Sequence, residues 1–138
     1  MPDIYDQLIL HEGVRYKPYK CTADKLTIGV GRNLEDKGLT EDEIYYLLQN
    51  DINDCLSDLN NLRWFTRLSN IRQRVLIDMR FNLGLRGLLS FKRMIAQLKE
   101  GNYEKASFEM LDSRWAKQVG KRAERLATMM KTNTDYKE

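Results

Sequence analysis

The residues best suited to chemistry in this chain are Glu12, Cys21 and Thr27, and the intervals between them are their most informative feature. Eight residues separate the acid from the thiol, and five separate the thiol from the hydroxyl. A carboxyl group acts as a general acid when it is held protonated, and a thiol becomes a base or a nucleophile when it loses its proton. A threonine hydroxyl orients a water molecule as donor or acceptor. The three side chains are therefore candidate catalytic residues.

Glu12 stands at an unusual place for an acid. Apolar residues at helical spacing predict a short first helix with Asp3 as its N-cap and Gly13 as its C-terminal stop. A helix C-terminus carries partial negative charge, so a carboxylate there is electrostatically unfavourable. Residues that are locally unfavourable in this way concentrate at functional sites. The same dipole favours the protonated form that a general acid needs. The ordinary alternative is a solvated Glu12 that pairs with Arg15 or Lys17.

The segments around these residues read His11-Glu12-Gly13-Val14-Arg15, Lys20-Cys21-Thr22 and Leu26-Thr27-Ile28-Gly29-Val30-Gly31. They resemble the active-site stretch of the phage-type lysozymes, the family of the T-even phage lysozyme. That family carries Glu, then Asp or in some members Cys, then Thr at this spacing. The resemblance implies that Glu12 protonates the departing oxygen of a glycosidic bond, while Cys21 and Thr27 position or activate the attacking water. Gly29 and Gly31 are expected to let the chain bend beside the substrate.

The role of Cys21 is open to three interpretations: base toward water, nucleophile on the sugar, or holder of a water. An unperturbed thiol has a pKa of about 8.5, so only a small fraction is thiolate at pH 7. The nearby cations Arg15, Lys20 and Lys25 are expected to lower the pKa of Cys21. The alternative outside catalysis is a small buried apolar residue, which is what most free cysteines are.

Two further segments resemble the family with lower specificity. Asp78-Met79-Arg80-Phe81-Asn82-Leu83-Gly84 is similar to its central helix, and Ser113-Arg114-Trp115 followed by Arg122-Ala123 is similar to its C-terminal segment. The resemblance implies that Asn82 faces the substrate cleft, that Trp115 packs beside it and that Arg122 pairs with Glu12. The alternatives are a core aromatic for Trp115 and a solvated helix residue for Arg122.

Local patterns predict the elements that position these residues. The stretch from about residue 15 to residue 30 is rich in β-formers and predicts a hairpin or a small three-stranded sheet. Thr40 and Glu43 form a capping-box signature at the start of a long helix with one apolar stripe, which ends near Asn60-Asn61. The remainder predicts shorter helices.

The predicted boundaries of these shorter helices follow from Gly, Ser and Asn residues. One apolar stripe stops at Gly84, and Ser90 is expected to cap the next helix. Asn102 opens another helix, Ser113 precedes a short one, and the last helix follows Gly120.

We therefore expect an α+β fold that is mostly helical and lysozyme-like. Residues 1–138 are predicted to form a single lysozyme domain. Within it we expect a β-containing lobe at about 13–39, a connecting helix at about 40–60 and a helical lobe at about 61–138. The substrate cleft is expected between the two lobes.

Composition excludes several classes of protein. A net charge of +3, with 42% apolar and 31% charged residues, fits a folded domain of 138 residues. Cys21 and Cys55 are too few for a disulfide framework, and His11 is the only histidine, so no metal and no cofactor are expected. The sequence has no apolar run long enough for a membrane span and no signal-peptide pattern, so the chain is expected to stay in the cytoplasm where it is made.

Basic residues are unevenly placed along the chain. Between Arg63 and Arg93 they are accompanied by a single acid, Asp78. Such a surface suits an anionic polymer, whether nucleic acid or bacterial wall, and solvated helix faces are the ordinary alternative.

The resemblance implies a muramidase that cleaves the β-1,4 bond between N-acetylmuramic acid and N-acetylglucosamine in peptidoglycan. It further implies a monomeric phage endolysin that stays in the host cytoplasm until lysis and then acts on the periplasmic cell wall. Its expected partners are the peptidoglycan glycan strand and a holin-type membrane protein, and no nucleic acid. Two alternatives are a catalytically silent lysozyme-fold protein that only binds peptidoglycan, and a cysteine peptidase or amidase that uses Cys21 and His11.

Overall fold

The computed structural model describes residues 3–137, and it confirms an α+β fold that is mostly helical. The chain forms two compact units, which we call the N-terminal unit, ending at Leu47, and the C-terminal unit, beginning at Leu48. Within residues 3–137, no helix is both long and apolar enough to cross a membrane. The grouping of both units into one lysozyme domain stays a prediction.

The N-terminal unit begins with helix α1, Ile4–Glu12, whose two ends are as predicted. Asp3 is the N-cap, and it exchanges hydrogen bonds with Asp6 in a capping box. At the other end Gly13 adopts a positive φ of 77° and donates its N–H to the carbonyl of Ile9. The left-handed conformation suits glycine and ends the helix directly after Glu12.

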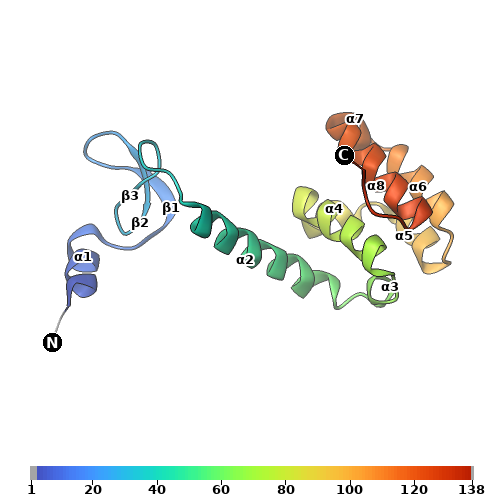
Figure 1. The fold of residues 1–138 in the computed structure, drawn as a ribbon, viewed down its shortest axis with the longest axis horizontal. Coiled ribbons are helices and arrows are strands. Elements are labelled where there is room, and N and C mark those ends of the chain that lie inside the picture. Colours follow the sequence, from blue (N-terminus) through green and yellow to red (C-terminus); the bar gives the residue numbers. More distant parts are fainter. Residues whose placement is uncertain (1–2, 138) are drawn as a thin grey trace. The chain divides into compact units, whose positions relative to one another are not determined.

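A three-stranded antiparallel sheet follows α1, in the order β1-β2-β3. Its strands are β1, Arg15–Lys20, β2, Leu26–Gly29, and β3, Arg32–Asn33. Thr27 lies opposite Tyr19 on one side and opposite Asn33 on the other, so it occupies the central strand. The predicted small sheet is confirmed, and Figure 1 shows it with α1 in the blue part of the chain.

Helix α2, Glu41–Leu59, begins with the predicted capping box. The Thr40 N–H donates to Glu43 Oε1 at 2.8 Å, and the Glu43 N–H donates to Thr40 Oγ1 at 3.3 Å. The Glu43 carboxylate also binds the guanidinium of Arg32, at 2.7 Å to each of two nitrogens. One side chain thus caps α2 and ties its first turn to strand β3.

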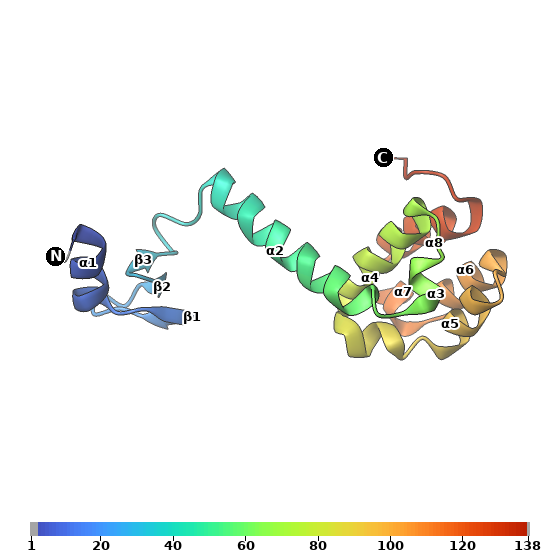
Figure 2. The ribbon, with the colours of Figure 1, turned by 90° about the horizontal axis from the view of Figure 1, so that it is seen from below.

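Every element of the C-terminal unit from α3 onward is a helix, and Figure 2 shows these helices gathered together. Helix α6 packs against both α5 and α8, and α8 also packs against α4 and α7. The helices are α3, Arg63–Thr66, α4, Asn70–Leu89, α5, Lys92–Lys99, α6, Tyr103–Leu111, α7, Arg114–Val119, and α8, Lys121–Thr132.

Helix α4 is interrupted at Gly84, where φ is 77° and ψ is 167°. The apolar stripe therefore stops there, as predicted, but the chain resumes its helical path to Leu89. Ser90 consequently closes α4, with its hydroxyl donating to the Gly87 carbonyl at 2.6 Å. The prediction that Ser90 caps the following helix was wrong, since Phe91 is the N-cap of α5. Asn102 and Ser113 do cap α6 and α7 through their side chains.

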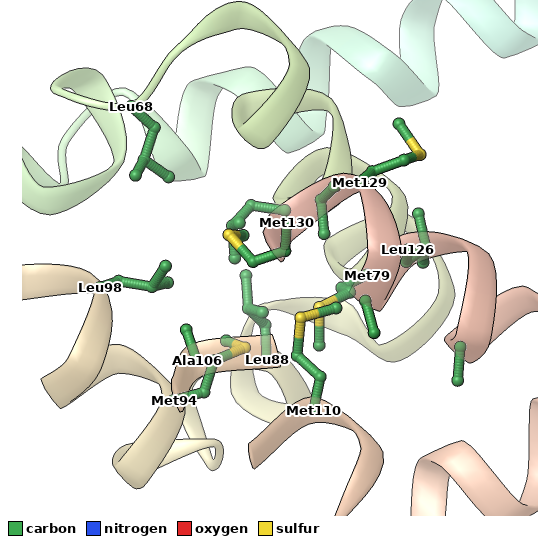
Figure 3. Close-up of a cluster of buried hydrophobic side chains, with 14 of the residues drawn as sticks. Leu68, Met79, Leu88, Met94, Leu98, Ala106, Met110, Leu126, Met129 and Met130 are labelled. Atoms are coloured by element: carbon green, nitrogen blue, oxygen red, sulfur yellow. The ribbon is translucent and has the colours of Figure 1, made fainter. Parts of the chain in front are cut away.

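The core of the C-terminal unit is rich in methionine. Figure 3 shows Met79, Met94, Met110 and Met130 converging with Leu88, and all five are fully buried. Their side chains come from α4, α5, α6 and α8. Unbranched methionines fill irregular gaps between helices that meet at different angles. This core fixes the helices that carry Asn82, Trp115 and Arg122.

Candidate active site

The carboxyl group of Glu12 lies against the turn between strands β2 and β3. A Cβ atom added at Gly31 would stand 2.8 Å from Glu12 Oε2 and 3.0 Å from Glu12 Cδ. Side chains essentially never show such contacts, so any residue larger than glycine at position 31 would force the Glu12 carboxyl to move. Gly31 also has a φ of +66°, which side chains rarely adopt.

Gly29 serves a different purpose from Gly31. Its φ is +70°, but an added Cβ would meet nothing within 4 Å. Gly29 therefore suits the path of the backbone alone, whereas Gly31 suits the backbone and also leaves space for the Glu12 carboxyl. The two predicted site glycines thus shape the turn in separable ways.

Thr27 is 3% exposed and lies in the central strand β2. Its hydroxyl donates to the carbonyl of Lys25 at 2.8 Å. With its hydrogen directed at Lys25, the Oγ atom keeps its lone pairs for a hydrogen-bond donor such as water.

Cys21 follows directly after strand β1 and is bound to the same carbonyl as Thr27. The Cys21 N–H donates to the Lys25 carbonyl at 3.0 Å, and the Asp24 N–H donates back to the Cys21 carbonyl at 2.8 Å. Asp24 adopts a positive φ of 60°, which closes this turn. One carbonyl oxygen, that of Lys25, therefore joins the backbone of Cys21 to the side chain of Thr27.

The pKa of the Cys21 thiol is lowered, chiefly by hydrogen bonding to the sulfur from the backbone of Lys25 and then of Ala23. Partial burial opposes the effect, and the Thr27 hydroxyl adds to it. A hydroxyl hydrogen rotates freely, so it is able to turn from the Lys25 carbonyl to a thiolate once one forms. The lowered pKa matches the expected direction and increases the thiolate fraction near neutral pH.

The expected cause of this shift was wrong, because the charges of Arg15, Lys20 and Lys25 are not among the groups that lower the pKa of Cys21. Lys20 Nζ binds Glu35 at 3.0 Å, and Lys25 Nζ binds Asp36 at 3.5 Å. Both carboxylates come from the loop after β3, which sequence proximity to Cys21 did not indicate. Backbone amides of the 21–25 turn, rather than ammonium groups, favour the thiolate.

Glu35 is a structural residue of the site that the sequence pattern did not reveal. Its carboxylate accepts the N–H of Leu26 at 2.9 Å as well as the Lys20 ammonium. The backbone N–H of Leu26, and then Lys20, hold the pKa of Glu35 below its ordinary value. Glu35 thus fixes the start of strand β2 immediately before Thr27.

In the C-terminal unit, the structure brings Asn82 and Trp115 together. Trp115 Nε1 donates to Asn82 Oδ1 at 2.7 Å, although the two residues lie 33 positions apart in the sequence. Trp115 is only 4% exposed, and its ring meets Phe91 edge to face at 5.9 Å between centroids. Trp115 is therefore a core aromatic whose polar atom is satisfied by the exposed Asn82.

An open pocket of about 520 Å³ lies beside Trp115, and we call it the Trp115 pocket. Leu83 and Phe91 contribute apolar surface to it. Its charged lining combines three cations with two acids: Lys92, Arg93, Arg114, Glu109 and Asp112. Such a mixed lining suits a ligand that carries both charges and apolar surface.

Arg122 forms an ion pair with Asp78 inside the C-terminal unit. Its Nη2 lies 2.7 Å and its Nε lies 2.8 Å from Asp78 Oδ1, and both side chains are 39% exposed. The implied pairing of Arg122 with Glu12 stays a prediction.

The candidate residues thus fall into two groups, one in each unit. Glu12, Cys21, Thr27, Gly29 and Gly31 belong to the N-terminal unit, and Asn82, Trp115 and Arg122 belong to the C-terminal unit. Among the residues that the structure describes, no cluster of three or more His, Cys, Asp or Glu side chains is arranged to hold a metal ion.

The sequence of this chain is similar to those of known proteins. The sequence model of the family described as Phage lysozyme matches residues 10–131. The chain is also similar to "Probable T4-type lysozyme 1" of Dictyostelium discoideum, with 26% identity over 95% of each chain. "Probable T4-type lysozyme 2" of the same organism is 24% identical over 96% of each chain. Since the family match covers most of the sequence, the chain belongs to the phage lysozyme family, whose members are glycoside hydrolases that act on peptidoglycan.

Proposed function

We propose that this protein is a muramidase that hydrolyses the β-1,4 bond between N-acetylmuramic acid and N-acetylglucosamine, with Glu12 as the general acid. The observation that carries the proposal is the position of the Glu12 carboxyl against Gly31, where any larger residue would displace it. The first helix ends at that point, so Glu12 is held at the negative end of a helix dipole. General acid catalysis requires a carboxyl group that delivers its proton to the leaving oxygen, and we assign this role to Glu12.

The remaining steps use Cys21 and Thr27. Glu12 transfers its proton to the glycosidic oxygen while the bond to the anomeric carbon breaks. Water adds to that carbon through its oxygen, with one of its hydrogens accepted by Thr27 Oγ. The Cys21 thiolate takes the proton that the water loses. Exchange with solvent then removes this proton from Cys21 and returns one to Glu12. The lowered pKa of Cys21 supports the role of base, since it provides thiolate near neutral pH.

A covalent role for Cys21 predicts a different intermediate. As a nucleophile, the thiolate would form a bond from sulfur to the anomeric carbon, and water would break that bond in a second step. Mass spectrometry of the protein quenched during turnover separates the two roles, because only the nucleophile gains the mass of a glycan. A holder of water would gain no mass and would tolerate Cys21→Ser.

Substrate binding in the C-terminal unit is proposed for Asn82, Trp115 and Arg122. The Trp115 pocket supports the assignment of Trp115, which lines it together with cations and acids that match the carboxylates and amines of peptidoglycan stem peptides. Asn82 is exposed beside the buried indole, so it keeps a hydrogen-bonding amide nitrogen for a sugar.

Glu12→Gln provides the direct test. We expect wild-type protein to clear a suspension of permeabilised Gram-negative cells and to release new reducing sugars from purified peptidoglycan. Glu12→Gln should lose at least about 100-fold of this activity, the scale of general acid catalysis. Glu41→Gln, which changes another exposed acid in the N-terminal unit, should remain active.

The outcomes of this test also address the alternatives. Equal clearing by wild type and Glu12→Gln would remove the acid assignment. Binding of peptidoglycan without any clearing by wild type would favour a catalytically silent wall-binding protein. Release of cut stem peptides instead of reducing sugars would favour the peptidase that uses Cys21 and His11.

We further propose that the protein acts as a monomeric phage endolysin, which waits in the host cytoplasm and lyses the cell from within. The resemblance of the active-site segments to phage-type lysozymes supports this role, whereas the relatives named above come from a eukaryote. A holin-type membrane protein would then give the enzyme access to the periplasmic wall. Expression in bacteria should cause lysis only when such a protein is co-expressed, and lysis without it would contradict the dependence. Sedimentation should give the mass of a single chain.

A further inference from the structure

The C-terminal unit carries a second open pocket, which shares no lining residue with the Trp115 pocket. It has a volume of about 610 Å³ and is formed by α3, the end of α5 and the start of α6. We call it the Trp64 pocket. Its charged and aromatic lining consists of Arg63, Trp64, Arg67, Lys99, Glu100 and Tyr103.

The two pockets lie at opposite ends of the hairpin formed by α5 and α6. These helices pack against each other and are joined by residues 100–102, so they run antiparallel. The Trp115 pocket takes Lys92 from the start of α5 and Glu109 from the end of α6. The Trp64 pocket takes Lys99 and Tyr103 from the other ends. The length of α5, about 12 Å at 1.5 Å per residue, separates them. Figure 2 labels the helices involved.

The charge of the Trp64 pocket is predominantly positive. Arg63 and Arg67 are one helical turn apart, since the Arg67 N–H donates to the Arg63 carbonyl at 3.3 Å. Like charges at this spacing repel each other and destabilise a helix. Within residues 3–137, neither of them nor Lys99 lies within 4.0 Å of a carboxylate oxygen. Three unneutralised cations therefore accompany one acid, Glu100.

The aromatic walls of the pocket are held in place by the protein. Trp64 is half-buried and packs against the hydrophobic core. The guanidinium of Arg72 covers one face of the Tyr103 ring, 3.6 Å from its centroid. Arg72 is itself fixed, because its Nε donates to the Met130 carbonyl at 2.7 Å. Rigid aromatic walls lose little conformational entropy when they bind a ligand.

We propose that the Trp64 pocket is a second binding site for the peptidoglycan polymer, built from residues other than those of the Trp115 pocket. A sugar ring packs its C–H groups on the indole of Trp64. Carboxylates of the stem peptides bind Arg63, Arg67 and Lys99, and a peptide amine binds Glu100. The proposal rests on the proposed function, which supplies the polymer.

The repeated structure of the wall is what makes a second site useful. Once one site holds the polymer, the other meets it at a high local concentration, so two weak contacts give strong retention. Nucleic acid is the competing occupant, since it also combines rings and negative charge. Proteins that bind single strands use a basic groove that follows the backbone, whereas this pocket is a single hollow with an acid in its wall.

The test uses full-length protein carrying Glu12→Gln, so that binding is measured without digestion. Retention on purified, insoluble peptidoglycan is compared for Glu12→Gln alone and together with Arg63→Glu and Arg67→Glu. The control carries Glu12→Gln with Lys105→Glu and Lys121→Glu, two exposed lysines with the same total change in charge. Trp64→Leu, checked by its melting curve, provides a second variant of the pocket.

We expect the arginine variant to bind at least about tenfold more weakly, the loss expected when two charged contacts are reversed. The lysine control should stay within about twofold of the parent protein. In the background with Glu12 intact, the arginine variant should cleave short soluble glycans at the normal rate but insoluble peptidoglycan more slowly. If the wild-type protein cleaves no peptidoglycan at all, the proposed muramidase function is contradicted. The binding comparison still decides whether the Trp64 pocket binds peptidoglycan.

Two results would overturn the proposal. One is equal retention on peptidoglycan by the arginine variant and the lysine control. The other is an arginine variant that binds a short single-stranded oligonucleotide more weakly than the parent protein does but binds peptidoglycan equally well. That result would assign the pocket to nucleic acid.

Discussion

The carboxyl group of Glu12 and the backbone of Gly31 occupy adjoining space, so that a Cβ atom at position 31 would lie 2.8 Å from Glu12 Oε2. The Glu12 carboxyl therefore keeps its place against the turn between β2 and β3 only while position 31 is glycine. Glu12 supplies the carboxyl group, and Gly31, which has no side chain, leaves room for it.

Gly31→Ala should abolish most activity by displacing the Glu12 carboxyl. We expect a loss of at least about 100-fold, because misplacement of a catalytic group by about 1 Å has effects of this size. Gly29→Ala is the matched control, since it has the same positive φ but an open Cβ position. Both variants should lose about 1–3 kcal/mol of stability from backbone strain. Turbidity clearing measures the activity and thermal melting measures the stability. Equal activity losses in both variants would show that the space beside the Glu12 carboxyl is not what makes Gly31 important.

Thr27→Val should raise the pKa of the Cys21 thiol, because it removes a hydroxyl that lowers this pKa. A higher pKa leaves less thiolate at pH 7, so alkylation of Cys21 by iodoacetamide should slow about two- to fivefold. Cys55 will not obscure the measurement, since it is 1% exposed and burial raises its pKa. Thr22→Val, a change at an exposed threonine, should leave the rate unchanged. An unchanged rate in Thr27→Val would show that the backbone amides alone set this pKa.

Glu43 should make stability depend on acid pH. Arg32 and the Thr40 cap lower the pKa of Glu43 to about 2 from its ordinary value of 4.5. A depressed pKa in the folded state stabilises the protein above the ordinary value, and this contribution disappears as the pH falls from 4.5 toward 2. The difference in melting temperature between wild type and Glu43→Gln should therefore be largest near neutral pH and shrink below pH 4.5. Glu41→Gln should show a small difference throughout, and a constant gap for Glu43→Gln would contradict the linkage.

Asn82→Ala should destabilise the C-terminal unit, because it leaves the Trp115 N–H without its acceptor. An unsatisfied buried donor costs about 1–3 kcal/mol. Asn82→Asp keeps an acceptor oxygen at the same place and should retain most of the stability. Denaturant unfolding followed by tryptophan fluorescence compares the two variants. Equal losses for alanine and aspartate would mean that the hydrogen bond contributes little.

Local features of the fold were predictable from the sequence because their signals are local. Asp3 and Gly13 mark the two ends of α1, and the Thr40–Glu43 box marks the start of α2. Ser90 was assigned to the wrong helix because the chain turns at Gly84 and then continues as helix, which a cap residue alone does not reveal.

Contacts between distant residues were not predictable in the same way. The Lys25 carbonyl joins Cys21 to Thr27, but a backbone oxygen has no signature in the sequence. The cations near Cys21 were expected to act on its thiol, and the loop after β3 instead supplies the carboxylates of Glu35 and Asp36 to them. Ion pairs and hydrogen bonds between residues that are distant in the sequence depend on the path of the folded chain, which local sequence patterns do not give.

Oxidation of the buried methionines is expected to measure how often the helices of the C-terminal unit separate. Met79, Met94, Met110, Met129 and Met130 are at most 3% exposed, so dissolved peroxide does not reach their sulfur atoms while the helices are packed. Conversion of each thioether to a sulfoxide requires a transient separation of the helices around it. The rate at which each methionine gains an oxygen atom therefore records, residue by residue, how often that part of the core opens in the native protein.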